Sequence, residues 1–250
     1  MIREPDLLRA LGLERGGVVS VVGAGGKTTL IYRLAREARL AGLRVLVTST
    51  THMGPLPAAA RGPLLLEAEQ RDSGACLGRL LAETGQITLL GRRVRDGKFR
   101  GLSPERVDEL RGEADLVLVE ADGARGRSLK VPADHEPVLP ASTTLLLVVA
   151  AIDVLGRPLT QEWVHRVSRV RALAATEGDI VDEGVLIAAL LWAEGYPAHF
   201  RSGLRSGVFL NKAEDAAGRL AAAGIAVALR PPYSLVAAGS ARGGPVTLWS

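Results

Sequence analysis

The chain has 250 residues, of which 47% are hydrophobic and 23% are charged, and its formal net charge at pH 7 is +4. This composition is typical of a globular protein and excludes extensive disorder. The mild charge and the 4% of aromatic residues argue against a nucleic-acid partner, whose groove needs basic clusters and stacking rings. No apolar run approaches the roughly 18 residues of a membrane span, and MIREPDLLRALGLERGG lacks the apolar core of a signal peptide, so we expect a cytoplasmic location.

Strand and helix signals alternate along the chain. A buried strand is expected at Val18–Val22, followed by a helix over Thr28–Ala41 whose apolar residues recur at helical spacing. Further short apolar runs predict strands at residues 44–50, 116–120, 144–152, 207–211 and 225–229. Continuous apolar strands separated by helices predict a single α/β domain over residues 1–250, with a mostly parallel sheet covered on both faces, of the P-loop NTPase-like kind.

Two segments depart from this alternation. Residues 84–101, TGQITLLGRRVRDGKFRG, predict a β-hairpin with Asp96-Gly97 as its turn. Residues 160–203 predict a small, mainly helical insertion that acts as a lid or subdomain. Between them, Ser103 followed by Pro104 is a typical helix start, because serine caps the first turn and proline fits within it.

A glycine-rich loop joins the first strand to the first helix. Glycines allow backbone N–H groups to converge on phosphate oxygens, and the helix N-terminus favours their charge. In such a loop Lys27 bridges the β- and γ-phosphates, and the Thr28 hydroxyl binds Mg²⁺. The loop is shorter than the usual one and resembles the GTNGKTT loop of Mur-type amide ligases. A turn without a ligand is the alternative, but the strand–loop–helix context favours a nucleotide site made by Gly23, Ala24, Gly25, Gly26, Lys27, Thr28 and Thr29.

Acidic and basic residues follow the strand at residues 116–120. Glu120 and Asp122 resemble the end of a Walker B strand, whose carboxylates hold Mg²⁺ and serve catalysis, although an acidic turn is the alternative. The loop that follows carries Arg125, Arg127 and Lys130, which predict an anion clamp beside the phosphates or a solvated basic loop.

Two further strand ends carry candidate site residues. Asn211-Lys212 begins the run NKAED, which resembles the base-reading NKxD element of G-proteins, but Glu214 stands where the aspartate belongs. The base therefore stays open between ATP and GTP. The run TSTTH ends in His52, a candidate base or ligand, with a helix cap as the alternative.

Five segments together resemble one family. They are VVGAGGKTTLIYRLA, VLVTSTTH, LVLVEADGARGRSLKVPADHEPVLP, VLGRPL with the following VHR, and VFLNKAED. Their order from about residue 17 to residue 215 resembles the accessory proteins of selenium-dependent molybdenum hydroxylases, the YqeC type. The resemblance implies a P-loop protein that acts in maturation of a molybdenum hydroxylase or its molybdopterin cofactor. It also implies roles in the second signature for Glu120, Asp122, Lys130 and His135.

Three functions compete on these grounds. The first is an Mg²⁺-dependent accessory enzyme that hydrolyses ATP or GTP or transfers a phosphoryl group. The second is a nucleotide-gated carrier or insertion chaperone without intrinsic turnover. The third is a Mur-like amide ligase, which we rank last because the tail after Asn211 is too short for an acceptor-binding domain.

Overall fold

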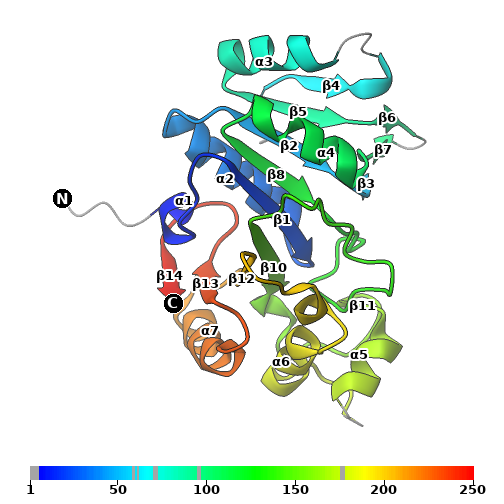
Figure 1. Ribbon diagram of the computed structural model, residues 1–250. Coiled ribbons are helices and arrows are strands. Elements are labelled where there is room, and N and C mark those ends of the chain that lie inside the picture. Colours follow the sequence, from blue (N-terminus) through cyan, green and yellow to red (C-terminus); the bar gives the residue numbers. More distant parts are fainter. Residues whose placement is uncertain (1–5, 58–59, 61, 70–72, 95–96, 175–177) are drawn as a thin grey trace, which may run out of the picture.

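The computed structural model describes residues 6–57, 60, 62–69, 73–94, 97–174 and 178–250, with the backbone alone at 73–76. In this part of the chain, nine strands form one sheet in the order β14-β13-β12-β10-β1-β8-β2-β5-β4 (Figure 1). In chain order these strands are β1 (Gly17–Gly23), β2 (Val45–Ser49), β4 (Leu64–Leu66), β5 (Gln86–Leu90), β8 (Leu116–Glu120), β10 (Leu145–Ala151), β12 (Arg205–Asn211), β13 (Leu235–Gly239) and β14 (Val246–Trp249).

Strand β1 lies in the middle of the sheet. It pairs in parallel with β8 on one side and with β10 on the other, so that Val19 faces both Leu118 and Leu145. The remaining pairings among the described strands are also parallel, apart from the antiparallel β13–β14 pair at one edge. The carboxyl ends of β1, β8, β2, β10 and β12 therefore meet at one edge, where ligands of parallel sheets bind.

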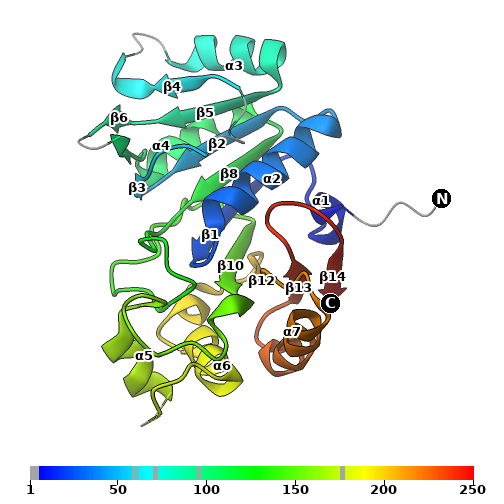
Figure 2. The ribbon, with the colours of Figure 1, turned by 180° about the vertical axis from the view of Figure 1, so that it is seen from behind.

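Helices cover both faces of the sheet (Figures 1 and 2). On one face, Leu30 and Ile31 pack with Val19 and Val21 in a fully buried cluster. On the other face, the alternate residue Val18 belongs to a second buried cluster. The first face carries α1 (Leu7–Ala10) and α2 (Lys27–Leu40), and the second carries α3 (Ser73–Thr84), α4 (Pro104–Leu110), α5 (Val167–Ala174), α6 (Glu183–Leu191) and α7 (Ala216–Leu229). The predicted fold class is confirmed, and among the described helices none has the length and apolarity needed to cross a membrane.

One predicted strand is wrong. Residues 225–229 form the last turns of α7, and the strand lies further on, in β13. The apolar run at 225–229 is too short for periodicity alone to distinguish a strand from a buried helix. Asp215 accepts a hydrogen bond from the Gly218 N–H and caps the helix, whose buried residues recur at helical spacing at Ala222, Ile225, Ala226 and Leu229.

The segment at 84–101 divides between two sheets. Its first half is β5 of the main sheet, whereas β6 (Arg92–Arg93) and β7 (Phe99–Arg100) pair antiparallel and join β3 (His52–Met53). Asp96 of the expected turn lies outside the described residues. This small sheet places β3 and β7 side by side at the end of β2.

Residues 160–203 contain two α-helices and shorter elements in their described part. Strand β11 (Val164–His165) pairs in parallel with β9 (Leu129–Lys130), which lies in the loop that follows β8. This pairing ties the helical segment to the loop that follows β8, at the carboxyl edge of the sheet. The remaining elements are the strands β9 (Leu129–Lys130) and β11 (Val164–His165) and the 3-10 helices η1 (Glu67–Glu69), η3 (Arg111–Glu113), η4 (Ile152–Val154) and η5 (Tyr196–His199).

Candidate functional site: a phosphate loop at the centre of the sheet

The loop between β1 and α2 has a backbone that only glycine fits at three positions, of which Gly23 and Gly26 show the closest approaches. Gly23 has a φ of 93°, and a Cβ added there would lie 2.2 Å from the Val149 carbonyl oxygen. Gly26 has a φ of 123°, and its Cβ would lie 2.4 Å from the Asn211 Nδ2. Both conformations are unfavourable for other residues. The glycines therefore let the loop pass close to β10 and β12 before α2 begins at Lys27.

Lys27 turns back into the loop. Its ammonium is 4% exposed, donates to the Gly23 carbonyl oxygen at 2.8 Å and pairs with Asp122 at 3.0 Å. Glu120 lies 3.8 Å away. Burial alone would lower the pKa of Lys27, but the two carboxylates outweigh burial and hold that pKa above its ordinary value. Lys27 is therefore a charged group at the centre of the loop.

Thr28 and Glu120 face each other across the first turn of α2. The Thr28 hydroxyl donates to Glu120 Oε2 at 2.7 Å, because β8 is the neighbour of β1 and ends at the level of the loop. Burial raises the pKa of Glu120, although Lys27 and Thr28 act in the opposite direction. A hydroxyl and a carboxylate are the hard oxygen donors that Mg²⁺ takes. Within the described residues, no cluster of three or more His, Cys, Asp or Glu forms a complete metal site, so these two residues fit a metal that phosphate oxygens and water also hold.

Asp122 is fully buried behind the loop. Its Oδ2 accepts the Gly23 N–H at 2.9 Å and the Tyr196 hydroxyl at 3.1 Å, and it pairs with Lys130 at 2.8 Å. Burial and the charge of Asp122 raise the pKa of Tyr196, so its hydroxyl keeps the proton that it donates. We predicted Asp122 as a metal ligand and catalytic residue, but its carboxylate instead positions the loop, with its oxygens directed at four protein groups.

Lys130 belongs to the same buried network. Besides Asp122, its ammonium contacts the Gly123 carbonyl oxygen at 2.7 Å and Glu136 at 2.9 Å. Burial would raise the pKa of Glu136, but Lys130 and the Ala133 N–H outweigh it and lower that pKa to about 2. The three N–H donors of Lys130 are thus occupied, which leaves none for the phosphate contact that we expected. His135, implied by the resemblance, is exposed in the loop.

Asn211 braces the phosphate loop and also lines a small pocket beside it. Its Nδ2 donates to the Gly25 carbonyl oxygen at 2.6 Å, and its Oδ1 accepts the Ala241 N–H at 2.7 Å. Lys212, with a φ of 62°, pairs with Asp153 at 2.5 Å. Asn211 therefore fixes the distance between the phosphate loop and the loop after β13.

A small pocket of about 270 Å³ opens beside Asn211. Glu214 lines it, whereas Asp215 is held as the cap of α7 and is not available to replace the missing aspartate of the NKxD pattern. The full lining is Gly26, Thr29, Asn211, Lys212, Glu214, Ser240, Ala241 and Arg242.

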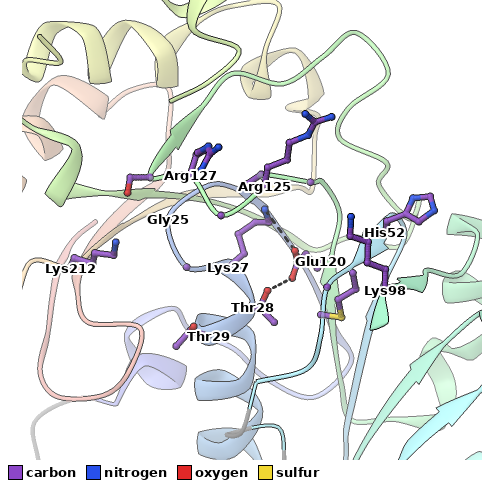
Figure 3. A pocket seen from close by; sticks show the side chains of 17 residues that line it. Gly25, Lys27, Thr28, Thr29, His52, Lys98, Glu120, Arg125, Arg127 and Lys212 are labelled. Carbon is purple, nitrogen blue, oxygen red and sulfur yellow. Dashed lines mark hydrogen bonds and ion pairs between the residues drawn. The ribbon is translucent and has the colours of Figure 1, made fainter. Parts of the chain in front are cut away.

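A larger pocket of about 700 Å³ lies over the phosphate loop and shares Gly26, Thr29 and Lys212 with the smaller one. Figure 3 shows Lys212 at one end of this pocket, Lys27 and Thr28 near its middle, and His52 and Lys98 at the other end. The predicted site residues that line it are Gly25, Gly26, Lys27, Thr28, Thr29, His52, Glu120, Arg125 and Lys212. Gly23, Ala24, Asp122, Lys130 and Asn211 support it from behind through their contacts.

Two of the hydroxyls that precede His52, those of Thr48 and Ser49, are used inside the protein. Thr48 donates to the Leu89 carbonyl oxygen, and Ser49 donates to that of Glu120. They hold β2 against its neighbours instead of facing a ligand. His52 is exposed on β3 at the edge of the large pocket, which leaves it able to contact a ligand.

Sequence reasoning missed several residues of this region. Tyr196 and Glu136 lie far from the glycine-rich loop in sequence, and neither belongs to a pattern that predicts its contact with Asp122 or Lys130. The loop at residues 240–242 was also missed, because it follows β13, which was not predicted. Lys98 belongs to the segment expected as a β-hairpin and carried no predicted role, yet it lines the large pocket.

A family model and one curated relative each match more than half of this chain. The model of the family described as "YqeC protein" matches residues 19–168. The chain is 34% identical over 202 residues to "Uncharacterized protein YqeC" of Escherichia coli (strain K12), an alignment that covers 80% of this chain and 77% of that protein.

Solved structures with a similar fold include two FtsY proteins. FtsY from Mycoplasma mycoides has a TM-score of 0.41 and 12% identity, and the match covers 94% of this chain and 63% of that one. Chloroplast FtsY from Physcomitrella patens has a TM-score of 0.43 and 17% identity, with coverages of 96% and 64%. The chain thus spans less than two thirds of the length of either structure.

Proposed function

Because this chain belongs to the YqeC family, we propose that it is an accessory protein that binds a nucleoside triphosphate with Mg²⁺ and hydrolyses it or transfers its terminal phosphoryl group. We further propose that this reaction serves maturation of a selenium-dependent molybdenum hydroxylase or of its molybdopterin cofactor. The first proposal rests on one observation: Lys27, Thr28 and Glu120 converge at the N-terminus of α2, next to a glycine loop. The second rests on the family resemblance.

Titration of the purified protein with ATP, GTP and CTP, each with and without Mg²⁺, tests the binding proposal. We expect at least one triphosphate to bind with an affinity that depends on Mg²⁺. Release of inorganic phosphate, measured with and without added candidate acceptors, separates hydrolysis from transfer. Absence of binding by all three nucleotides would remove the proposal.

We predict that Glu120→Gln weakens triphosphate binding in a manner that depends on Mg²⁺. The carboxylate contacts the Thr28 hydroxyl and is placed to hold the metal directly or through water, and loss of such support typically costs about tenfold in metal affinity. Isothermal titration should show about a tenfold loss of affinity in Mg²⁺ and no loss in EDTA. An equal loss under both conditions would assign Glu120 to the loop rather than to the metal.

We propose GTP as the preferred nucleotide, because Glu214 lines the small pocket beside the phosphate loop. A carboxylate there can accept hydrogen bonds from the N–H groups on the edge of guanine, which adenine does not offer in the same arrangement. Hydrogen bonds to charged groups contribute about 1.5–3 kcal/mol. Glu214→Gln should therefore weaken GTP binding by about tenfold or more and leave ATP binding nearly unchanged.

A competition assay against a fluorescent triphosphate measures this GTP/ATP ratio. Glu83→Gln is a suitable control, because Glu83 is exposed on α3 and lines neither the small nor the large pocket. If Glu214→Gln and the control give the same ratio, the segment after β12 does not distinguish the two bases.

A nucleotide-gated carrier or chaperone is the second candidate function. It is favoured by the contact between the Tyr196 hydroxyl and Asp122, which joins η5 of the helical segment to the residue behind the phosphate loop. Loops that contact phosphates commonly change order when nucleotide binds. Binding without turnover in the absence of a partner protein would favour this candidate over the enzyme, whereas intrinsic turnover would favour the enzyme.

A further inference from the structure

The large pocket has more positive charge than the phosphate loop requires. Its described lining contains the cationic side chains Lys27, Lys98, Arg125, Arg127 and Lys212, against the single carboxylate of Glu120. Lys27 and Lys212 are already paired with Asp122 and Asp153. In the described structure the side chains of Lys98, Arg125 and Arg127 form no ion pair or hydrogen bond, so their charges are free to meet a ligand.

The proposed nucleotide accounts for only part of the large pocket. The order of strands β12-β10-β1-β8-β2 puts the small pocket on the β12 side of the phosphate loop and Glu120 on the β8 side. A triphosphate whose nucleoside enters the small pocket would present its terminal phosphate toward β8 and β2. The pocket lining continues to Met53 and Gly54. Figure 3 shows His52 and Lys98 at this end of the pocket.

A third hollow extends the pocket on this side. It has a volume of about 350 Å³, shares His52 with the large pocket and is also lined by Thr50, Thr51 and Arg100. The combined space is enough for a small molecule beside the nucleotide, since complete ligand sites commonly occupy roughly 300–1,000 Å³. The lining of the third hollow adds the exposed cationic side chain of Arg100, so positive charge continues along this side of the pocket.

We propose that the end of the pocket between β3 and the loop after β8 binds a second substrate through a phosphate monoester. Lys98 and Arg125 supply two charges for a dianion, and the Arg125 guanidinium offers the paired N–H donors that suit phosphate. Arg125 lies in an exposed turn with a φ of 50°, and it lines the same pocket as Gly25 and Lys27. This inference rests on the proposed triphosphate site, because the second substrate would lie next to the terminal phosphate.

Equilibrium dialysis with radiolabelled inorganic phosphate tests this proposal on the full chain. The phosphate loop is first filled with a saturating β,γ-imido triphosphate and Mg²⁺, whose binding is measured separately. We expect one further saturable phosphate site per chain, weakened about threefold to fivefold by Lys98→Ala and by Arg125→Ala, in keeping with exposed ion pairs. Acetate at equal concentration should compete poorly, because it carries one charge.

Arg36→Ala is the matched control, because Arg36 is exposed on α2 and does not line the pocket. If the analogue-loaded protein binds no phosphate, the second-substrate site alone is overturned. It is also overturned if Lys98→Ala and Arg125→Ala both leave phosphate binding unchanged. Failure of the analogue itself to bind would instead count against the triphosphate site, and with it the site that depends on it.

Discussion

Replacement of Lys27 by alanine is expected to weaken triphosphate binding by roughly 30- to 700-fold, which corresponds to about 2–4 kcal/mol for loss of one buried charged contact. The reason is that Lys27 supplies the ammonium at the centre of the loop, within reach of any phosphate held by the N-terminus of α2. Isothermal titration in Mg²⁺ at fixed ionic strength measures the loss. Fixed ionic strength is needed because salt screens the same contacts.

The Lys27→Ala variant needs a control for folding, because the ammonium of Lys27 that it removes also neutralises Asp122. The melting temperature of the variant should be measured as well, and the titration should be carried out at a temperature at which the variant is folded. Arg36→Ala removes a cation from the exposed face of the same helix and should leave affinity unchanged. Equal affinities for the wild-type chain and a folded Lys27→Ala variant would mean that phosphates do not bind at this loop.

The Asp122→Asn substitution should have the largest effect on stability. Asp122 is fully buried, and its charge compensates the ammonium groups of Lys27 and Lys130 while it orders Gly23 and Tyr196. Removing one partner from a buried ionic network typically costs about 3–5 kcal/mol, because the remaining charges stay buried without compensation. For a chain of this length the melting temperature should fall by roughly 6–20 °C. Calorimetry or circular dichroism measures this change.

Asp134→Asn provides the comparison for that result. The Asp134 side chain is 87% exposed and pairs with Arg169 at the surface, so its neutralisation should change the unfolding free energy by less than about 0.5 kcal/mol. Similar melting temperatures for Asp122→Asn and Asp134→Asn would show that the buried network contributes little.

The local part of the site was accessible to sequence reasoning. A strand, a glycine loop and a helix are contiguous, so their geometry follows from residue type and periodicity. The meeting of Thr28 with Glu120 was also predictable, because both follow buried strands whose ends share one edge of a parallel sheet.

Contacts that depend on packing were not accessible in this way. The role of Asp122 depends on Tyr196, which lies 74 positions further along the chain and reaches it only after the helical segment folds over the sheet. Lys130 was expected at a phosphate because its loop follows β8. A turn of that same loop instead brings Glu136 to the Lys130 ammonium. Residues 225–229 were assigned to a strand because the spacing in so short an apolar run fits a strand as well as a helix. In the structure they belong to a helix that begins after its cap at Asp215.

Lys27 and Lys130 both pair with the Asp122 carboxylate, and this affects how a ligand can enter the loop. When Lys27 turns toward an arriving phosphate, Asp122 keeps Lys130 as its counter-ion and does not become an unpaired charge in a dry interior. A site with a single lysine would have to import a proton or a metal ion at that moment, or admit water. Here the empty loop and the filled loop are both electrically compensated. The loop can therefore stay preformed without a ligand, and we expect ligand entry to require a side-chain rotation of Lys27 rather than refolding of the loop.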